Sequence, residues 1–189
     1  LNNLDLKLVK VIDTHIHADH ISALNELNKR TNCIRVMGEK SKSEVIDLRI
    51  KDGEKIKVEE VELQAIYTPG HTDCSYSFLM NDRVFTGDTL LINGSGRTDF
   101  QNGNAYDAYD SIFNKLLKLP EKTLVFPAHD YNGKKFSTIE NEKNNNPRLQ
   151  VSSKEEYADI MNNLNLANPK MMDVAVPANV KGLTLDNIN

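Results

Sequence analysis

All five histidines of this 189-residue chain lie in three short segments, residues 14–20, 68–72 and 126–130. A fourth segment, residues 85–89 (Phe-Thr-Gly-Asp-Thr), adds a carboxylate at the end of an apolar run. Neutral imidazole is the commonest metal ligand in proteins, and a carboxylate adds charge and a hard oxygen donor. The fold must therefore bring together four segments that are far apart in the sequence, and the pattern predicts a metalloenzyme.

The first segment holds the densest group of potential ligands. Its sequence is Thr-His-Ile-His-Ala-Asp-His, which places ionisable groups at His15, His17, Asp19 and His20. His15 and His17 are two residues apart, so they point the same way if the segment is extended. A single histidine often has only a structural role, but four ionisable groups within six residues are costly to bury without partners. We therefore interpret the segment as part of a functional site.

Strands and helices are expected to alternate along the chain, with the ligand segments on loops after strands. Six segments have the pattern of strands: residues 7–13, 33–37, 55–67 (one long strand or a hairpin), 75–80, 83–86 and 123–126. Four segments have helical periodicity: the stretch after residue 20, and residues 106–118, 137–144 and 153–164. Asp19 is expected to cap the first helix, and a capping box that begins at Ser152 is expected to open the last. This arrangement predicts an α/β sandwich.

Composition argues against several kinds of partner. The net charge of −4 gives no reason to expect nucleic acid or an anionic membrane as the main partner. No apolar run has the length of a transmembrane helix, and no signal peptide is recognisable. Cys33 and Cys74 form neither a disulfide framework nor a Cys-x-x-Cys metal site, which favours a reducing compartment. The length fits a single domain over residues 1–189.

The order His-x-His-x-Asp-His, then Gly-His, then Gly-Asp, then a late histidine resembles the metallo-β-lactamase superfamily. The resemblance extends from about residue 8 through His129. It implies a four-layer αββα sandwich with the metal at one edge of the two sheets. That fold normally opens with a β-hairpin and a further strand ahead of the His-x-His loop. Because only a dozen residues precede this loop, we expect a domain that lacks those N-terminal strands.

Two glutathione-handling branches of the superfamily compete: glyoxalase II, a thioester hydrolase with two metals, and the ETHE1-like persulfide dioxygenases, with one ferrous iron. Glyoxalase II carries segments that resemble Gly-Arg-Phe-x-Glu-Gly and Gly-His-Glu-Tyr, whereas this chain has Thr-Asp-Phe-Gln at 98–101 and Ala-His-Asp-Tyr at 128–131. The short C-terminal segment also suits the dioxygenases. Four segments in all favour the dioxygenase branch: residues 94–101, 126–133, 146–149 and 175–179.

This resemblance implies one Fe(II) per chain, held by the catalytic residues His15, His71 and Asp88. Two histidines and one carboxylate form the facial ligand set of non-haem ferrous oxygenases. The other members of the cluster complete a second metal site in the related hydrolases and orient ligands and water in the dioxygenases; they are His17, Asp19, His20 and His129. The ligand types also fit two zinc or iron ions, and only the flanking segments favour a single iron.

Arg97 and Tyr131 match positions at which relatives contact glutathione. Arginine can pair with a carboxylate through two parallel hydrogen bonds, and tyrosine offers a hydroxyl beside an apolar ring. Arg97 could instead pair with Asp99 and hold its own loop.

The resemblance implies oxidation of glutathione persulfide by O2 to sulfite and glutathione. One alternative is a binuclear hydroxyacylglutathione hydrolase of the glyoxalase II kind, and another is a non-catalytic sulfur- or metal-sensing module. The expected location is the cytoplasm of a bacterium or the mitochondrial matrix of a eukaryote. A homodimer is one alternative for the assembly.

Overall fold

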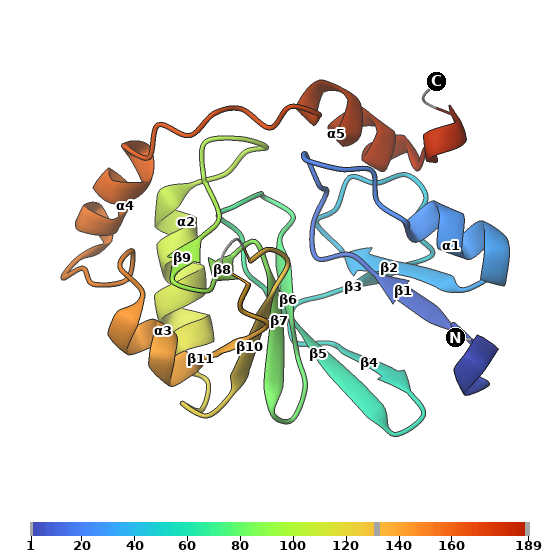
Figure 1. Ribbon diagram of the computed structural model, residues 1–189, viewed down its shortest axis with the longest axis horizontal. Coiled ribbons are helices and arrows are strands. Elements are labelled where there is room, and N and C mark those ends of the chain that lie inside the picture. The colour runs from blue at the N-terminus through green and yellow to red at the C-terminus, as the bar shows by residue number, and fades with distance from the viewer. Residues whose placement is uncertain (1, 131–132, 188–189) are drawn as a thin grey trace.

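The computed structural model describes residues 2–130 and 133–187, and two sheets dominate it (Figure 1). The smaller sheet has three parallel strands in the order β1-β2-β3, which are Lys10–Ile12, Ile34–Gly38 and Leu48–Ile50. The larger sheet has the order β11-β10-β7-β6-β5-β4. In chain order its strands are β4 (Lys55–Val58), β5 (Val61–Tyr67), β6 (Tyr76–Leu79), β7 (Arg83–Gly87), β10 (Leu124–Pro127) and β11 (Ser137–Thr138). A small ribbon of β8 (Leu90–Leu91) and β9 (Gly94–Ser95) follows β7.

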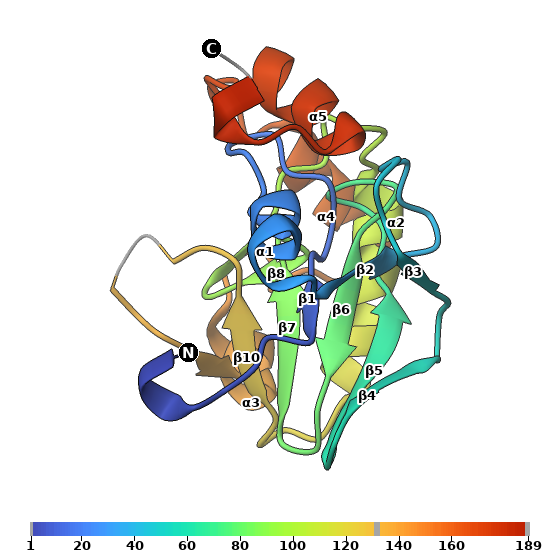
Figure 2. The same ribbon diagram turned by 90° about the vertical axis from the view of Figure 1, so that its right-hand side faces the viewer.

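Helices cover the outer side of each sheet. On the side of the smaller sheet lie α1 (Leu24–Thr31) and α5 (Met172–Lys181), and α5 lies at the end of the sheet from which the loop after β1 emerges (Figure 2). On the side of the larger sheet lie α2 (Ala105–Tyr109), α3 (Ile139–Asn145) and α4 (Lys154–Asn162). This αββα layering confirms the predicted fold class.

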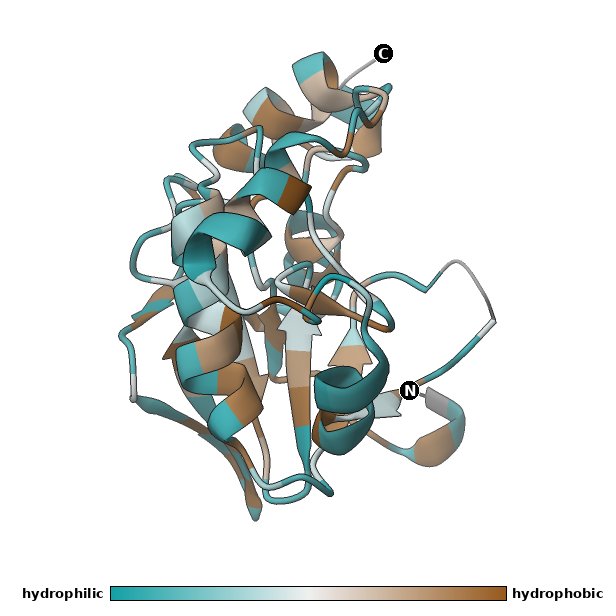
Figure 3. Ribbon diagram, turned by 90° about the vertical axis from the view of Figure 1, so that its left-hand side faces the viewer, coloured by the Kyte–Doolittle hydropathy of each residue, from teal (hydrophilic) through white to brown (hydrophobic). Residues whose placement is uncertain are grey.

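Apolar side chains fill the spaces between the layers, whereas much of the outer surface of the helices is hydrophilic (Figure 3). The largest core cluster joins the larger sheet to its helices, and its fully buried members include Val84, Ile112, Leu116, Val125 and Tyr157. A second cluster lies between the two sheets and includes Val36, Ala65, Tyr76 and Phe78. Burying one such side chain contributes about 1.5–3 kcal/mol, so these contacts hold the layers together.

Most predicted elements are present, often with shorter bounds, but two helix starts were predicted wrongly. Asp19 does not cap α1, which begins after Ala23; the hydroxyl of Ser22 accepts the backbone N–H of Leu24 instead. The N-cap of α4 is Ser153 rather than Ser152.

A serine and a glutamate do cap α4, one residue later than predicted, although the glutamate accepts the N–H of the residue before the N-cap and not that of the N-cap itself. The Ser153 hydroxyl accepts the N–H of Glu156, and the carboxylate of Glu156 accepts the N–H of Ser152.

Residues 55–67 form a hairpin, one of the two predicted alternatives, with Glu59 in the turn at a φ of 51°. Two further differences have local causes. Residues 106–118 are not one regular helix, because α2 continues into a π-helical turn (Asp110–Lys115) and a 3-10 turn (Leu116–Lys118). The helix α5 was not predicted, since Pro177 interrupts its pattern.

Candidate metal centre

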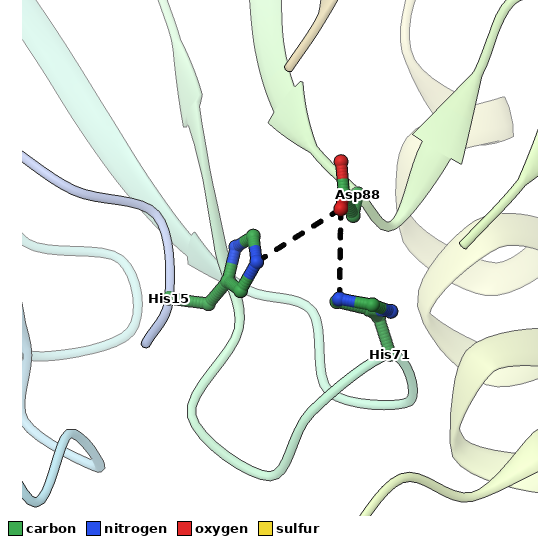
Figure 4. Close-up of side chains that lie close together, drawn as sticks. All are labelled: His15, His71 and Asp88. Atoms are coloured by element: carbon green, nitrogen blue, oxygen red, sulfur yellow. Dashed lines mark ion pairs between the residues drawn. The ribbon is translucent and has the colours of Figure 1, made fainter. Parts of the chain in front are cut away.

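Three side chains from three loops meet at one end of the sheets (Figure 4). His15 follows β1, His71 follows β5, and Asp88 follows β7. The Nε2 atoms of His15 and His71 lie 4.0 Å and 3.6 Å from Oδ2 of Asp88. One ligand atom from each residue lies within 4.8 Å of the other two, a spacing at which one ion can be held between them. The structure thus brings together the three residues that the sequence analysis assigned to the iron.

Hydrogen bonds turn the rings of both histidines so that Nε2 faces Asp88. Nδ1 of His71 lies 2.8 Å from the carbonyl oxygen of Arg97, and since a carbonyl only accepts, Nδ1 carries the proton. The lone pair of this imidazole is therefore on Nε2. Nδ1 of His15 lies 2.9 Å from the hydroxyl of Thr14. Metal-binding histidines are commonly oriented by such bonds at the second nitrogen.

The centre is buried and carries a polar atom without a partner. His15 is 1% exposed, and burial, followed by the nearby His17, holds the pKa of His15 well below its usual range. The imidazole is thus neutral and able to bind a cation. Oδ1 of Asp88 is buried and has no hydrogen-bond partner among the described residues. Such an oxygen is costly unless it is paired, and a donor set of two imidazoles and one carboxylate fits a divalent metal ion.

A second group of potential ligands lies beside the first. His17, Asp19 and His20 each offer a ligand atom within 4.8 Å of the others, but Asp19 and His20 are exposed. Burial, followed by the charge of His20, lowers the pKa of His17 to about 4. Nε2 of His129 lies 3.3 Å from Oδ2 of Asp19 and 3.6 Å from Oδ2 of Asp88, so His129 connects the two groups.

Asp13 supports this second group and was missed in the sequence analysis. Its Oδ1 lies 3.9 Å from Nε2 of His17, and its Oδ2 accepts the hydroxyl of Ser22 at 2.5 Å. Burial raises the pKa of Asp13. The position of this carboxylate, two residues before His15, was the only signal in the sequence that could have identified it.

A cavity of about 540 Å³ opens beside the centre, and His71, Asp88 and His129 contribute to its wall. Small-molecule sites commonly have volumes of a few hundred Å³, so the cavity could hold a peptide-sized substrate. Arg97 also lies on this wall. Tyr131, the other predicted substrate contact, lies outside the described residues.

The guanidinium of Arg97 is held by its own loop and by a neighbouring one. It donates to both carboxylate oxygens of Asp99 at 2.7 Å and to the carbonyl oxygens of Leu166 and Ala167. It also lies over the ring of Phe100. The pairing with Asp99, which was the alternative reading of Arg97, is therefore present, and its contact with substrate stays a prediction.

Arg148 is a second cation on the cavity wall. The sequence analysis gave it no role of its own and used it only within residues 146–149, one of the segments that favour the dioxygenase branch. Its guanidinium donates to the carbonyl oxygen of Ser95. Burial lowers the pKa of Arg148, and within residues 2–130 and 133–187 it forms no ion pair with a carboxylate. A half-buried cation without an acidic partner is a favourable contact for an anionic group of a substrate.

Comparison with known proteins places these features in a family. The pattern of the Metallo-beta-lactamase superfamily matches residues 37–129. The chain is 44% identical to the mitochondrial persulfide dioxygenase ETHE1 of Homo sapiens and 43% identical to that of Mus musculus, and each alignment covers 96% of this chain and 72% of the relative. A hydroxyacylglutathione hydrolase of Dictyostelium discoideum is 32% identical, over 75% of this chain and 56% of its own length.

Solved structures give the same picture. The crystal structure of ETHE1 from Myxococcus xanthus has a TM-score of 0.92 and 49% sequence identity, and the match covers 95% of this chain and 79% of that one. A metallo-β-lactamase from Staphylococcus aureus has a TM-score of 0.90 at 23% identity and so shows the fold alone. Both sequence identity and coverage are higher for the dioxygenases than for the hydrolase.

Proposed function

The chain belongs to the persulfide dioxygenases of the metallo-β-lactamase superfamily, and on this basis we propose that it oxidises glutathione persulfide with O2 to sulfite and glutathione. The observation that carries the proposal is the meeting of His15, His71 and Asp88, the last two of which line the large cavity. Two histidines and one carboxylate leave further coordination positions open. The site therefore suits a reaction in which the substrate and O2 are brought together.

The proposed cofactor is one Fe(II) per chain, held by His15, His71 and Asp88. When bound, Fe(II) supplies the one-electron chemistry that a persulfide needs to react with O2. The protein contributes a fixed ligand geometry, since the carbonyl of Arg97 orients the ring of His71. It also keeps His15 neutral at physiological pH, because burial lowers the pKa of that residue.

Other groups on the cavity wall are suited to bind the glutathione part of the substrate. Glutathione carries two carboxylates, and the wall presents the guanidinium groups of Arg97 and Arg148. Leu91, Leu166 and Pro169 form apolar parts of the same wall. His129 lies between Asp19 and Asp88, where its imidazole can hold a proton or orient a carboxylate.

One observation favours a second function. His17, Asp19 and His20 could hold a second ion next to the first, as a binuclear hydroxyacylglutathione hydrolase requires. Two ions would generate a hydroxide near neutral pH, and the substrate would be a thioester rather than a persulfide. The alternative thus differs from the main proposal in both metal count and reaction.

The two functions can be separated in one experiment. The protein is purified without oxygen and loaded with Fe(II), and the metal content per chain is measured. Oxygen uptake and sulfite formation are then followed with glutathione persulfide, and thioester cleavage is followed with a hydroxyacylglutathione. We expect about one iron per chain and sulfite in proportion to iron. Two metals per chain with thioester cleavage would support the hydrolase, and bound metal with neither reaction would support a sensing module.

We propose the bacterial cytoplasm or the mitochondrial matrix as the place of this reaction. The named dioxygenase relatives are mitochondrial, and Cys33 and Cys74 are free and buried. Among the described residues, no helix is long and apolar enough to cross a membrane. Fractionation of the cells that produce the protein, with detection by an antibody, tests this location.

A further inference from the structure

The loop between β1 and α1 carries five of the ionisable groups of the site but contains no helix or strand. Its shape therefore depends on bonds to other parts of the chain. Three of these bonds come from one side chain, that of Asn179 on α5, which is 157 to 162 residues further along the sequence. Figure 2 shows α5 beside this loop at one end of the sheets. Asn179 belongs to the segment 175–179, to which the proposed reaction assigns no role.

The amide of Asn179 is matched to three backbone groups of the loop. Its Nδ2 donates to the carbonyl oxygens of His17 and His20, each at 2.9 Å. Its Oδ1 accepts the backbone N–H of Ser22 at 2.8 Å. An asparagine amide offers two N–H donors and one carbonyl acceptor, and here both donors and the acceptor are used. Aspartate would keep the acceptor and lose both donors, and alanine would lose all three bonds.

We propose that Asn179 is a positioning residue, which closes the segment 17–22 into the shape that holds Asp19 against His129 at the metal centre. The inference rests on the proposed function, because it assigns to this segment a role in the reaction. Nε2 of His129 lies 3.3 Å from Oδ2 of Asp19, so a displacement of the segment is passed to His129. Asn179 does not line the large cavity, and among the described residues its side chain forms no hydrogen bond with His15, His71 or Asp88.

The helix that carries Asn179 is itself fixed. The hydroxyl of Ser43 donates to the backbone carbonyl of Asn179 at 3.2 Å, and the N–H of Glu44 donates to the carbonyl of Val180 at 2.8 Å. Val176 and Val180 pack against a buried cluster that includes Ile16 and Leu24. The amide therefore comes from a rigid support, as positioning requires.

The iron ligand in the same loop has separate supports. The backbone of Ile16, next to His15, donates its N–H to the thiol of Cys74 and accepts a hydrogen bond from Nε2 of Gln101 at 2.7 Å. Loss of the Asn179 amide should therefore loosen residues 17–22 while His15 stays in place. Loss of the Gln101 side chain should instead loosen the backbone next to His15 and weaken metal binding, while residues 17–22 stay in place.

The test uses the full chain with Asn179→Ala and Asn179→Asp, each with and without Fe(II). We expect amide hydrogen exchange in residues 17–22 to be at least about tenfold faster in both variants, with iron content near that of the wild type. Outer partners of metal ligands typically contribute about 10- to 100-fold, and Asn179 acts one step further out, through Asp19 and His129. We therefore expect kcat for sulfite formation to fall by about the lower of these factors. KM should change less than kcat, because Asn179 itself does not line the cavity, and of the loosened segment only Ala18 and Asp19 do. If the alanine variant does not fold, the same measurements on the aspartate variant test the proposal, because aspartate keeps the bond to Ser22.

The matched control is Ile139→Val, which weakens the core between the larger sheet and its helices but leaves α5 and residues 17–22 unchanged. At a similar loss of Tm it should retain both kcat and the exchange protection of residues 17–22. The proposal is overturned if Ile139→Val lowers kcat as much as Asn179→Ala does, or if exchange in residues 17–22 is unchanged in the Asn179 variants. If the wild type does not oxidise persulfide, the proposed function fails, whereas hydrogen exchange and iron content still decide the role of Asn179.

Discussion

His71 and His129 both lie near Asp88, but their surroundings differ. His71 is oriented by the Arg97 carbonyl and faces only the proposed iron site, whereas His129 also faces Asp19. We expect His71→Ala to lose both iron and activity. His129→Ala should retain most of its iron and lose activity by about 10- to 100-fold, as is typical of groups that orient ligands. Iron per chain and sulfite production are measured in both variants, and equal loss of iron would show that His129 is a ligand.

Arg148 should contribute to binding of glutathione rather than to the chemical step. Arg148→Ala is expected to raise KM for glutathione persulfide by about tenfold or more, with a smaller effect on kcat, since one charge-assisted contact contributes about 1.5–3 kcal/mol. Steady-state kinetics check this result. A small persulfide without the glutamyl and glycyl groups is the control, and its KM should hardly change. An equal loss with both substrates would mean that Arg148 mainly supports the loop at Ser95.

Arg97→Ala should likewise raise KM for glutathione persulfide more than it lowers kcat. The structure supplies a control, because the guanidinium of Arg97 is paired with Asp99. Asp99→Asn breaks this ion pair but leaves the cation on the cavity wall. If the Asp99→Asn and Arg97→Ala enzymes have the same KM, the loop and not the substrate accounts for the effect.

Acidification should destabilise the metal-free protein through His17. The pKa of this residue is about 4 in the folded state against a usual value of 6.5, mainly because of burial. Between these values the unfolded chain binds a proton that the folded chain does not, so stability falls as pH decreases from about 6.5 to 4. One pKa unit corresponds to about 1.4 kcal/mol, which gives a loss of ~3 kcal/mol. Thermal unfolding of the metal-free chain at several pH values should show this slope, and His17→Gln should reduce it.

Site residues could be predicted from the sequence where they are clustered or follow a predicted strand. His15, His71 and Asp88 each follow a strand, and their short motifs reveal the residue types that a metal needs. Asn179 and Arg148 could not be found in this way. Their roles depend on contacts with residues 53 and 162 positions away in the sequence, and no local pattern marks a hydrogen bond to a distant backbone carbonyl.

At the scale of elements, the loop that presents His71 depends on close contact with α2. Gly70 has a φ of 137°, and a Cβ at this position would lie 2.3 Å from the Cα of Ala108. We expect Gly70→Ala to lower the free energy of unfolding by about 2–4 kcal/mol, from steric overlap and backbone strain, and to weaken iron binding. Thermal unfolding and iron content measure the two effects.

Gly53 provides the matched control for Gly70. It also has a positive φ, 80°, but a Cβ there would meet no atom within 4 Å. Gly53→Ala should therefore cost only the strain of the backbone, about 1–2 kcal/mol, and leave iron binding intact. If both substitutions had the same effect on unfolding and on iron, the contact between Gly70 and α2 would not be what fixes the loop.

The elements themselves differ in how well the sequence predicts them. The strands β5 and β6 and the helices α3 and α4 were predicted because alternation, periodicity and a capping box act over a few residues. The exact start of a helix was less predictable. Several side chains near the start of a helix can serve as its cap. Asp19 was the predicted cap of α1, but it lies near His129 in the site instead.

At the scale of the whole molecule, the metal centre joins the two sheets. His15 follows a strand of the smaller sheet, whereas His71 and Asp88 follow strands of the larger one. An ion bound to all three connects the sheets directly at this end of the molecule, where the loops have no regular structure of their own. Metal binding should therefore stabilise the fold as a whole and not only the site.

Fe(II) titrated into the metal-free protein without oxygen should raise Tm until one ion per chain has bound. At a free concentration about 100 times Kd, a ligand that binds only the folded state adds about 2.7 kcal/mol, which for a chain of this size is roughly 5–11 °C. We expect the shift to be abolished by His71→Ala and largely retained in Asp19→Asn, because Asp19 belongs only to the second group of ligands. A second stabilising step at two ions per chain that disappears in Asp19→Asn would contradict the single iron and favour the binuclear hydrolase.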